Sequence, residues 1–327
     1  MTWENFIIAP RRSAAVAILL AGLVAFAALA QSGKPLRILV GYSAGGAVDA
    51  LARSVGQQIA ATSKETVIVE NKPGASTNIA VKALIDSPPD GQTLLMAANA
   101  LAANGALFDP PPFDIARDIV PVAMVGRVPV VIATSVESKI DSLAKLIDAA
   151  KKQPHTVTYA TPGNGSTPHL VIGLFERTAG ISLLHVPYKG GAPAIADVLG
   201  GHVMLVAVNV LEVLPLVCGG KLKVLAVVSK ARTSVLPDVP TVAESGYPQF
   251  EASVWYGLVA PAKTSPAVVA RLNAQVQLAL ESPTVKQMLA DAGGEAFPGM
   301  PEQFCAFFQS ERARYEKLIR DAGIKPD

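Results

Sequence analysis

Two glycine-rich turns constrain the fold of this chain more than any other feature of its sequence. The segment VGYSAGGAVD begins at Val40, and the segment YATPGNGSTPH begins at Tyr159. Each follows an apolar run of strand length and opens an apolar run with helical character. The first amides of a helix have no intrahelical partner and carry the positive end of the helix dipole, so such a turn attracts anions. The two turns therefore predict an anion site with two halves.

The first thirty residues have the features of an export signal. Arg11 and Arg12 precede an apolar run over 14–27, and the small residues at 28–30 form a cleavage motif. We expect residues 1–30 to be removed on export. The alternative is a retained membrane anchor, because the apolar run approaches the roughly 17 residues that span a bilayer.

Composition and charge narrow the class of protein. Of the 327 residues, 50% are hydrophobic and 17% are charged, which is typical of a well-buried α/β protein. A net charge of +2 gives no electrostatic footprint for nucleic acid. Cys218 and Cys305 are too few and too far apart for a disulfide scaffold, and the four histidines lack metal spacing. We expect unpaired cysteines, no metal, no cofactor and no nucleic-acid partner.

Apolar runs of strand length alternate with helical patterns, which predicts mainly parallel sheets flanked by helices. The chain length fits two lobes of roughly 100–200 residues each. Crossings near Ala133 and Val254 make the first lobe discontinuous, with residues 31–133 and 255–327, and leave 134–254 for the second. The expected strands are 36–40, 66–69, 93–97, 128–133, 156–159, 202–206, 224–228 and 256–259, and the expected helices are 48–60, 78–85, 143–151, 168–178, 193–199 and most of the tail from 265.

Nucleotide binding is excluded by what surrounds the glycines. Gly41 and Gly46 have the spacing of a P-loop, but apolar residues follow where phosphate chemistry needs Lys and Ser or Thr. Gly163 and Gly165 begin a dinucleotide fingerprint, but Pro168 occupies the third glycine position. Neither turn therefore reads as a nucleotide site.

Three side chains in the turns have a structural and a functional interpretation. Ser166 lacks the flanking glycines of a nucleophile elbow and is best read as a helix cap. His169 is favoured as a structural residue over a ligand contact. Asp49 fits amide capping and ligand contact equally well.

With no Lys or Arg expected beside the turns, main-chain dipoles would hold the anion. One helix terminus contributes about 0.3–1 kcal/mol, whereas micromolar affinity needs roughly 8 kcal/mol. Both halves must therefore close over the ligand, as the lobes of a hinged protein do.

Several long segments resemble one family, the substrate-binding proteins of tripartite tricarboxylate transporters, also called Bug proteins. The segments are AGGAVDALAR, VIVENKPGASTNIA, PDGQTLL, DIVPVAMVG, YATPGNGSTPH, HVPYKGGAPAIADVLGGHV, GKLKVLAV and LPDVPTVAESGYPQFEASVWYGLVAP. The resemblance implies a periplasmic, non-enzymatic and monomeric protein of the two-lobed, type II-like periplasmic binding protein fold, with a hinge of two crossing strands. It also implies a small carboxylate ligand and membrane transporter subunits as partners.

Carried over by motif position, the resemblance gives the candidate ligand-binding residues. The first turn offers Tyr42, Ser43, Ala44, Gly46 and Asp49, and a loop after the third strand offers Asn104. The second turn offers Thr161, Gly163, Asn164, Gly165, Ser166 and His169.

Departures from the family pattern bear on specificity. Gly41 stands where the family usually has Pro, and Ser76 and Thr77 replace a glycine pair. Met204 and apolar neighbours replace the usual acidic residues, which leaves Asn209 as the only polar side chain expected in the stretch MLVAVNVLEVL. We therefore predict a pocket less polar than is usual and a carboxylate with an apolar or aromatic body.

Two other functions stay open at this point. An orphan binder on the same fold would feed a sensor protein instead of a transporter. An exported enzyme acting on a carboxylic acid is disfavoured, because no base, nucleophile pair or metal set accompanies the turns.

Overall fold

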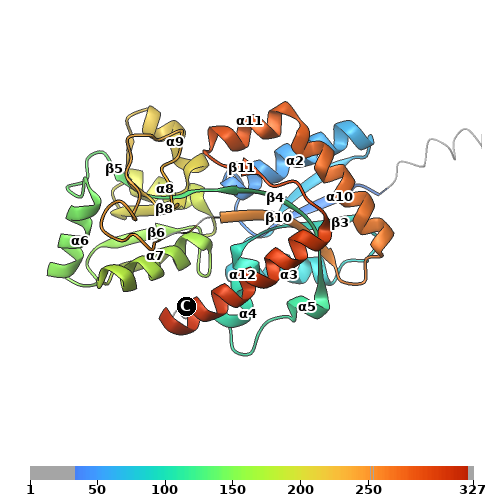
Figure 1. The fold of residues 1–327 in the computed structure, drawn as a ribbon, viewed down its shortest axis with the longest axis horizontal. Coiled ribbons are helices and arrows are strands. Elements are labelled where there is room, and N and C mark those ends of the chain that lie inside the picture. The colour runs from blue at the N-terminus through green and yellow to red at the C-terminus, as the bar shows by residue number, and fades with distance from the viewer. Residues whose placement is uncertain (1–33, 251, 253, 323–327) are drawn as a thin grey trace, which may run out of the picture.

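The computed structural model of the protein describes residues 34–250, 252 and 254–322. Residues 1–30, where an export signal is expected, lie outside this part of the chain. The described residues form two β-sheets that lie side by side along the long axis of the molecule, each flanked by helices (Figure 1). Within the described ranges, no helix is long and apolar enough to cross a membrane.

The first sheet is mixed. Its strands are β1 (Leu36–Val40), β2 (Val67–Asn71), β3 (Thr93–Ala98), β4 (Ile119–Val128), β10 (Val254–Pro261) and β11 (Glu295–Ala296), in the order β11-β4-β10-β3-β1-β2. β1 pairs in parallel with β2 and β3, whereas β10 runs antiparallel to both β3 and β4. The flanking helices are α2 (Ala47–Ser63), α3 (Asn78–Ile85), α4 (Asn99–Leu107), α5 (Ile115–Asp118), α10 (Pro266–Glu281), α11 (Pro283–Asp291) and α12 (Pro301–Ala322), with the short helix η1 (Ala75–Thr77).

The second sheet is also mixed. Its strands are β5 (Val130–Ser135), β6 (Thr158–Thr161), β7 (Leu184–Pro187), β8 (Leu205–Asn209) and β9 (Leu222–Val227), in the order β7-β6-β8-β5-β9. β6 pairs in parallel with β7 and β8, and β5 runs antiparallel to β8 and β9. The flanking helices are α6 (Leu143–Lys152), α7 (Thr167–Ala179), α8 (Gly191–Leu199) and α9 (Val210–Cys218).

The strands of the first sheet are buried on both faces. In β1, Ile38 and Val40 point to the side covered by α2 and α10, and Leu39 points to the side covered by α3, α4 and α12. Side chains of a strand alternate between faces, so a strand that is apolar at every position requires cover on both. This sandwich holds the ends of β1 and β3 rigidly at one edge of the sheet.

The chain passes between the sheets twice. It leaves the first sheet after Val128 and enters the second at Val130, and it returns between Val228 and Val254. The change of sheet thus falls at Pro129, before the boundary at Ala133 expected from the sequence. The run VPVVIATS is apolar throughout, so composition alone does not mark where its strand changes partners.

One expected loop is a helix. The stretch around Asn104 forms α4, a helix that is buried over most of its length. Apolar residues occur on all sides of this helix, so its sequence shows no amphipathic period. Asn104 therefore lies inside a packed helix and not on a loop.

Candidate functional site

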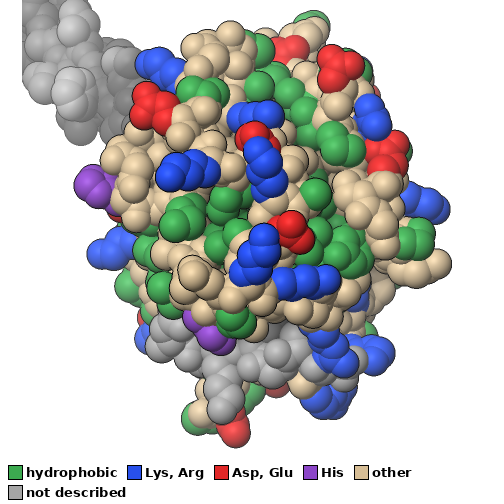
Figure 2. All heavy atoms as spheres, turned by 90° about the vertical axis from the view of Figure 1, so that its left-hand side faces the viewer, with side chains coloured by type: hydrophobic (Ala, Val, Ile, Leu, Met, Phe, Trp, Pro, Cys, Tyr) green, Lys and Arg blue, Asp and Glu red, His purple; other side chains and the backbone are tan. Residues whose placement is uncertain are grey.

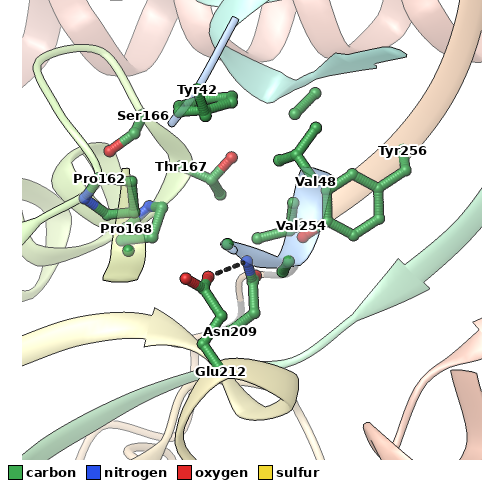
Figure 3. A pocket seen from close by; sticks show the side chains of 14 residues that line it. Tyr42, Val48, Pro162, Ser166, Thr167, Pro168, Asn209, Glu212, Val254 and Tyr256 are labelled. Carbon is green, nitrogen blue, oxygen red and sulfur yellow. Dashed lines mark hydrogen bonds between the residues drawn. The ribbon is translucent and has the colours of Figure 1, made fainter. Parts of the chain in front are cut away.

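A pocket lies between the two lobes, and both sheets contribute to it (Figure 3). The cavity volume of this pocket is about 20 Å³, which is room for about one water molecule and well below the range for small-molecule sites. Its lining is mostly apolar. The lining residues are Tyr42, Gly46, Ala47, Val48, Ala98, Pro162, Ser166, Thr167, Pro168, Gly191, Asn209, Glu212, Val254 and Tyr256.

Five helices begin at this pocket. Their N-cap residues are Gly46 (α2), Ala98 (α4), Ser166 (α7), Gly190 (α8) and Asn209 (α9). In all of these except α7, the side chain of the N-cap residue makes no hydrogen bond to the first turn. Helix dipoles from both lobes therefore converge on one small space, which favours negative charge there.

Cations are kept away from the pocket. Among the described residues, no Lys or Arg lines it. Basic side chains of the second lobe lie on the outer surface instead, interspersed with acidic ones (Figure 2). Lys189 lines a neighbouring hollow that shares Tyr42 and Pro162 with the pocket.

Some residues of the first turn line the pocket, and another joins the two lobes. Tyr42 and Gly46 line the pocket. The amide of Ser43 donates to the carbonyl of Lys189 at 2.7 Å, which joins the two lobes directly. Ala44 is exposed and lies outside the lining.

Asp49 braces the first turn from behind. One carboxylate oxygen accepts from the backbone amide of Gly45 at 3.0 Å, and the other accepts from the side-chain Nδ2 of Asn71 at 2.9 Å. Arg53 pairs with both oxygens. Burial alone raises the pKa of Asp49, but these donors together lower it below its usual value. Of its two interpretations, the geometry favours capping.

Two residues of the second turn support it without lining the pocket. The Thr161 hydroxyl lies 2.7 Å from Nε2 of His185 and accepts from the amide of Gly163 at 3.2 Å. His169 accepts from the amide of Gly165 and stacks on His185 with ring centroids 4.1 Å apart. Burial, together with His169, lowers the pKa of His185 to about 3, so this ring stays neutral.

The remaining members of the second turn face the first lobe. Ser166 lines the pocket and caps α7, because its hydroxyl accepts from the amide of His169. Gly163 and Asn164 line the neighbouring hollow. Gly165 has a φ of +68° and lies against α4, where a Cβ would come within 3.3 Å of Oδ1 of Asn104. Asn104 itself donates to the carbonyl of Ser76 and to Asn78, so it fixes the contact between α4 and η1.

Asn209 lines the pocket, and Glu212 joins it there. Nδ2 of Asn209 donates to Oε1 of Glu212 at 3.1 Å (Figure 3). Burial of its carboxyl raises the pKa of Glu212 to about 7, although Asn209 and the amide of Ala47 partly oppose this. The expectation that Asn209 is the one polar side chain of its stretch is therefore wrong.

Four polar atoms of the lining are buried without a hydrogen-bond partner in the described part of the chain. They are Oγ1 of Thr167, Oδ1 of Asn209, Oε2 of Glu212 and the hydroxyl of Tyr256. Each such atom costs about 1–3 kcal/mol if it stays unsatisfied. Native proteins seldom leave several together outside a functional site.

Two parts of the candidate site were not predicted, although a pattern in the sequence marks each of them. The segment VPYKGGAPAIADVL has the same strand, glycine and helix pattern as the two turns, and its Gly191 lines the pocket. Glu212 stands three residues after Asn209, the spacing of a capping box. Tyr256 and Val254, from the returning strand, carried no local signal.

Two α/β lobes that enclose a pocket at converging helix starts define a solute-binding protein of the periplasmic type. In the described ranges, no group of three or more His, Cys, Asp or Glu residues could hold a metal ion. The chain belongs to the family described as the tripartite tricarboxylate transporter family receptor, which matches residues 51–324. The fold and the family predicted from the sequence are thereby confirmed, and the family is a non-enzymatic one.

The relatives agree along almost the whole chain. Protein BugT of Bordetella pertussis is 36% identical over 294 residues, which cover 89% of this chain and 90% of BugT. A protein of R. palustris solved with adipate has a TM-score of 0.86 at 31% identity, with 90% of this chain and 99% of that one covered. MatC from Rhodopseudomonas palustris, solved with bound malate, has a TM-score of 0.83 at 27% identity, with 87% and 98% covered.

Proposed function

We propose that the protein captures a small organic carboxylate between its two lobes and delivers it to the membrane subunits of a tripartite tricarboxylate-type transporter. One observation carries the proposal: the pocket combines helix starts whose N-cap side chains make no capping hydrogen bond with buried, unpartnered polar atoms and no lining Lys or Arg in the described residues. A carboxylate satisfies such donors and takes the favourable end of each dipole.

The magnitudes support a closed site rather than a single turn. One partly buried helix terminus contributes up to about 2 kcal/mol, so several that converge, together with charge-assisted hydrogen bonds, approach the roughly 8 kcal/mol of micromolar binding. The adipate and malate bound by the two related proteins support this ligand class.

The proposal assigns roles to the candidate residues. Tyr42, Gly46, Ser166 and Asn209 contact the ligand, and Gly191, Thr167, Glu212 and Tyr256 join them. Ser43, Asp49, Asn104, Thr161, Gly165 and His169 hold the turns in place. The body of the acid lies against Val48, Pro162 and Val254, in keeping with the apolar part that the sequence predicts.

A thermal-shift screen tests the ligand class. Adipate, malate and an aromatic acid are added to the purified protein, and the uncharged diamides of the same diacids serve as controls. An acid present at 100 times its Kd is expected to add about 2.7 kcal/mol to the free energy of unfolding, because it binds only the folded state. If no acid raises the melting temperature, or if the diamides raise it equally, carboxylate capture is contradicted.

A further inference from the structure

Glu212 occupies an unexpected place for an acidic side chain. Its carboxyl lies between Gly46 and Gly191, which belong to opposite lobes at the starts of α2 and α8. A Cβ on Gly46 would come within 3.4 Å of Oε2, and one on Gly191 would overlap it. The acid thus sits where the amides of two helices converge, inside the pocket proposed for a carboxylate.

A contact with the N-cap residue of α9 accounts for only half of this carboxyl. Glu212 is the third residue of α9, and its Oε1 accepts from Nδ2 of Asn209, the N-cap residue. That contact uses Oε1. Oε2 is closed off from solvent, has no hydrogen-bond partner in the described residues, and belongs to the pocket lining.

Among the described residues that line the pocket around Oε2, none carries a positive side chain. The titratable groups that face it are the phenols of Tyr42 and Tyr256, and the described lining contains no Lys, Arg or His. Burial raises the pKa of both phenols above their ordinary value, and the charge of Glu212 raises them further, so they remain neutral below pH 9. An ionised Glu212 would therefore face a ligand carboxylate without a counter-ion, and like charges at such range repel strongly.

Resting on the proposed function, we propose that Glu212 is a specificity-determining residue: it holds a proton and uses it to donate a hydrogen bond from Oε2 to the bound carboxylate. Ligand and proton are then taken up together. A neutral carboxylic acid in this position adds a donor to the converging amides, and an acid ligand replaces the missing partner of Oε2.

The proposal gives binding a definite pH dependence. The pKa of Glu212 is raised to about 7, so the protonated, binding-competent fraction falls above that pH. The apparent Kd is the intrinsic Kd divided by that fraction, which makes binding about 100-fold weaker at pH 9 than at pH 6.

The decisive experiment compares the wild type with Glu212→Gln, which keeps an acceptor oxygen for Asn209 and an N–H donor but cannot titrate. The Kd of adipate and of malate is measured by calorimetry from pH 6 to pH 9. The wild type is expected to lose about 100-fold, whereas Glu212→Gln stays within about threefold of its pH 6 value. Glu137→Gln, an exposed site on the second lobe, is the matched control and is expected to follow the wild type.

The protonation of Glu212 can also be tested without a ligand, from the pH dependence of the melting temperature. Because burial raises the pKa of Glu212 in the folded state from its ordinary value of 4.5 to about 7, stability that is present below pH 4.5 is lost as the pH rises to about 7. The melting temperature of Glu212→Gln minus that of the wild type is therefore expected to grow between pH 5 and pH 8. A difference that stays constant overturns the proposal.

The remaining outcomes separate the two proposals. If an acid binds with the same pH profile in the wild type and in Glu212→Gln, the role of Glu212 is wrong and carboxylate capture stands. If binding strengthens with pH and is lost in Glu212→Gln, Glu212 is an ionised acceptor for a ligand donor, which also overturns the inference. If neither acid binds at any pH, both proposals are contradicted.

Discussion

At the scale of single residues, the tightest contact across the pocket is between Gly191 and Glu212. Gly191 is the first residue of α8, and its backbone has no positive φ, so the chain itself accepts an alanine there. The added methyl group would overlap Oε2 of Glu212. The glycine is therefore required by what it touches and not by its own conformation.

We predict that Gly191→Ala both weakens ligand binding and destabilises the fold. The carboxyl of Glu212 must move out of its place, which costs about 1–3 kcal/mol of stability for overpacking. We expect at least a tenfold higher Kd for the acid, equal to about 1.4 kcal/mol. Calorimetry gives the Kd and urea unfolding gives the stability.

Gly105→Ala provides the control for this change. Gly105 lies within α4, where a Cβ would meet only Ile115 at 4.0 Å. Replacing an interior helix glycine by alanine is expected to add about 0.5–1 kcal/mol to stability and to leave the Kd unchanged. If Gly191→Ala binds the acid with wild-type affinity, the start of α8 is not part of the binding site.

At the scale of elements, a buried polar cluster fastens α12 to the first sheet. Oε2 of Glu311 accepts from Nε1 of Trp255 at 3.0 Å, and Asn99 donates to the hydroxyl of Tyr315 and accepts from the amide of Trp255. The cluster joins α12, β10 and the start of α4. Because α12 also contacts α7, this anchor influences the contact between the lobes.

Removing the acidic member of this cluster is expected to destabilise the fold. Glu311→Ala leaves the Trp255 N–H buried without its acceptor, which costs about 1–3 kcal/mol. Glu311→Gln keeps an acceptor oxygen and should lose less. Glu316→Ala, an exposed site on the same helix, should change the free energy of unfolding by no more than about 0.5 kcal/mol. Urea unfolding compares all three, and equal losses in Glu311→Ala and Glu316→Ala would refute the anchor.

Elements with a local signal were predictable from the sequence. The helix expected over 78–85 is α3, and the proline and serine at the start of α7 mark its beginning. α4 and α9 were missed because α4 is apolar on all sides and α9 contains Pro215, which breaks a helical pattern. β4 was missed in most of its length, since Pro121 and Gly126 interrupt its apolar run.

The site was predictable where its residues belong to a turn. Tyr42, Gly46, Ser166 and Asn209 follow a strand or cap a helix, and the structure brings all four to one pocket. Asp49, Thr161 and His169 stand in the same turns but face away, because their side chains satisfy main-chain amides. Sequence spacing places a residue in a turn but does not say which way its side chain points.

At the scale of the whole molecule, we propose that the lobes open and close about the two crossings near Pro129 and Val254. The hydrogen bond from Ser43 to Lys189 and the packing of Gly165 against α4 describe the closed form. Both contacts join the two lobes, so we expect a ligand to enter when they separate.

The two cysteines of the chain allow this motion to be measured. Cys218 is exposed at the end of α9, Cys305 is half-buried in α12, and both thiols are free. Fluorescent dyes on the two thiols are expected to change their energy-transfer efficiency when adipate or malate binds. Singly labelled Cys218→Ser and Cys305→Ser proteins control for local quenching. Unchanged transfer at a ligand concentration that calorimetry shows to be saturating would contradict closure.

The place of β10 in the first sheet sets the order in which the chain can fold. This strand lies between β3 and β4, yet it is made after the whole second lobe. Until residues 254–261 leave the ribosome, β3 and β4 each lack a neighbour and expose unpaired edges. Domains that need long-range pairing fold late. The first strands of the first lobe are therefore made before the second lobe, but the first lobe can complete its fold only after the second.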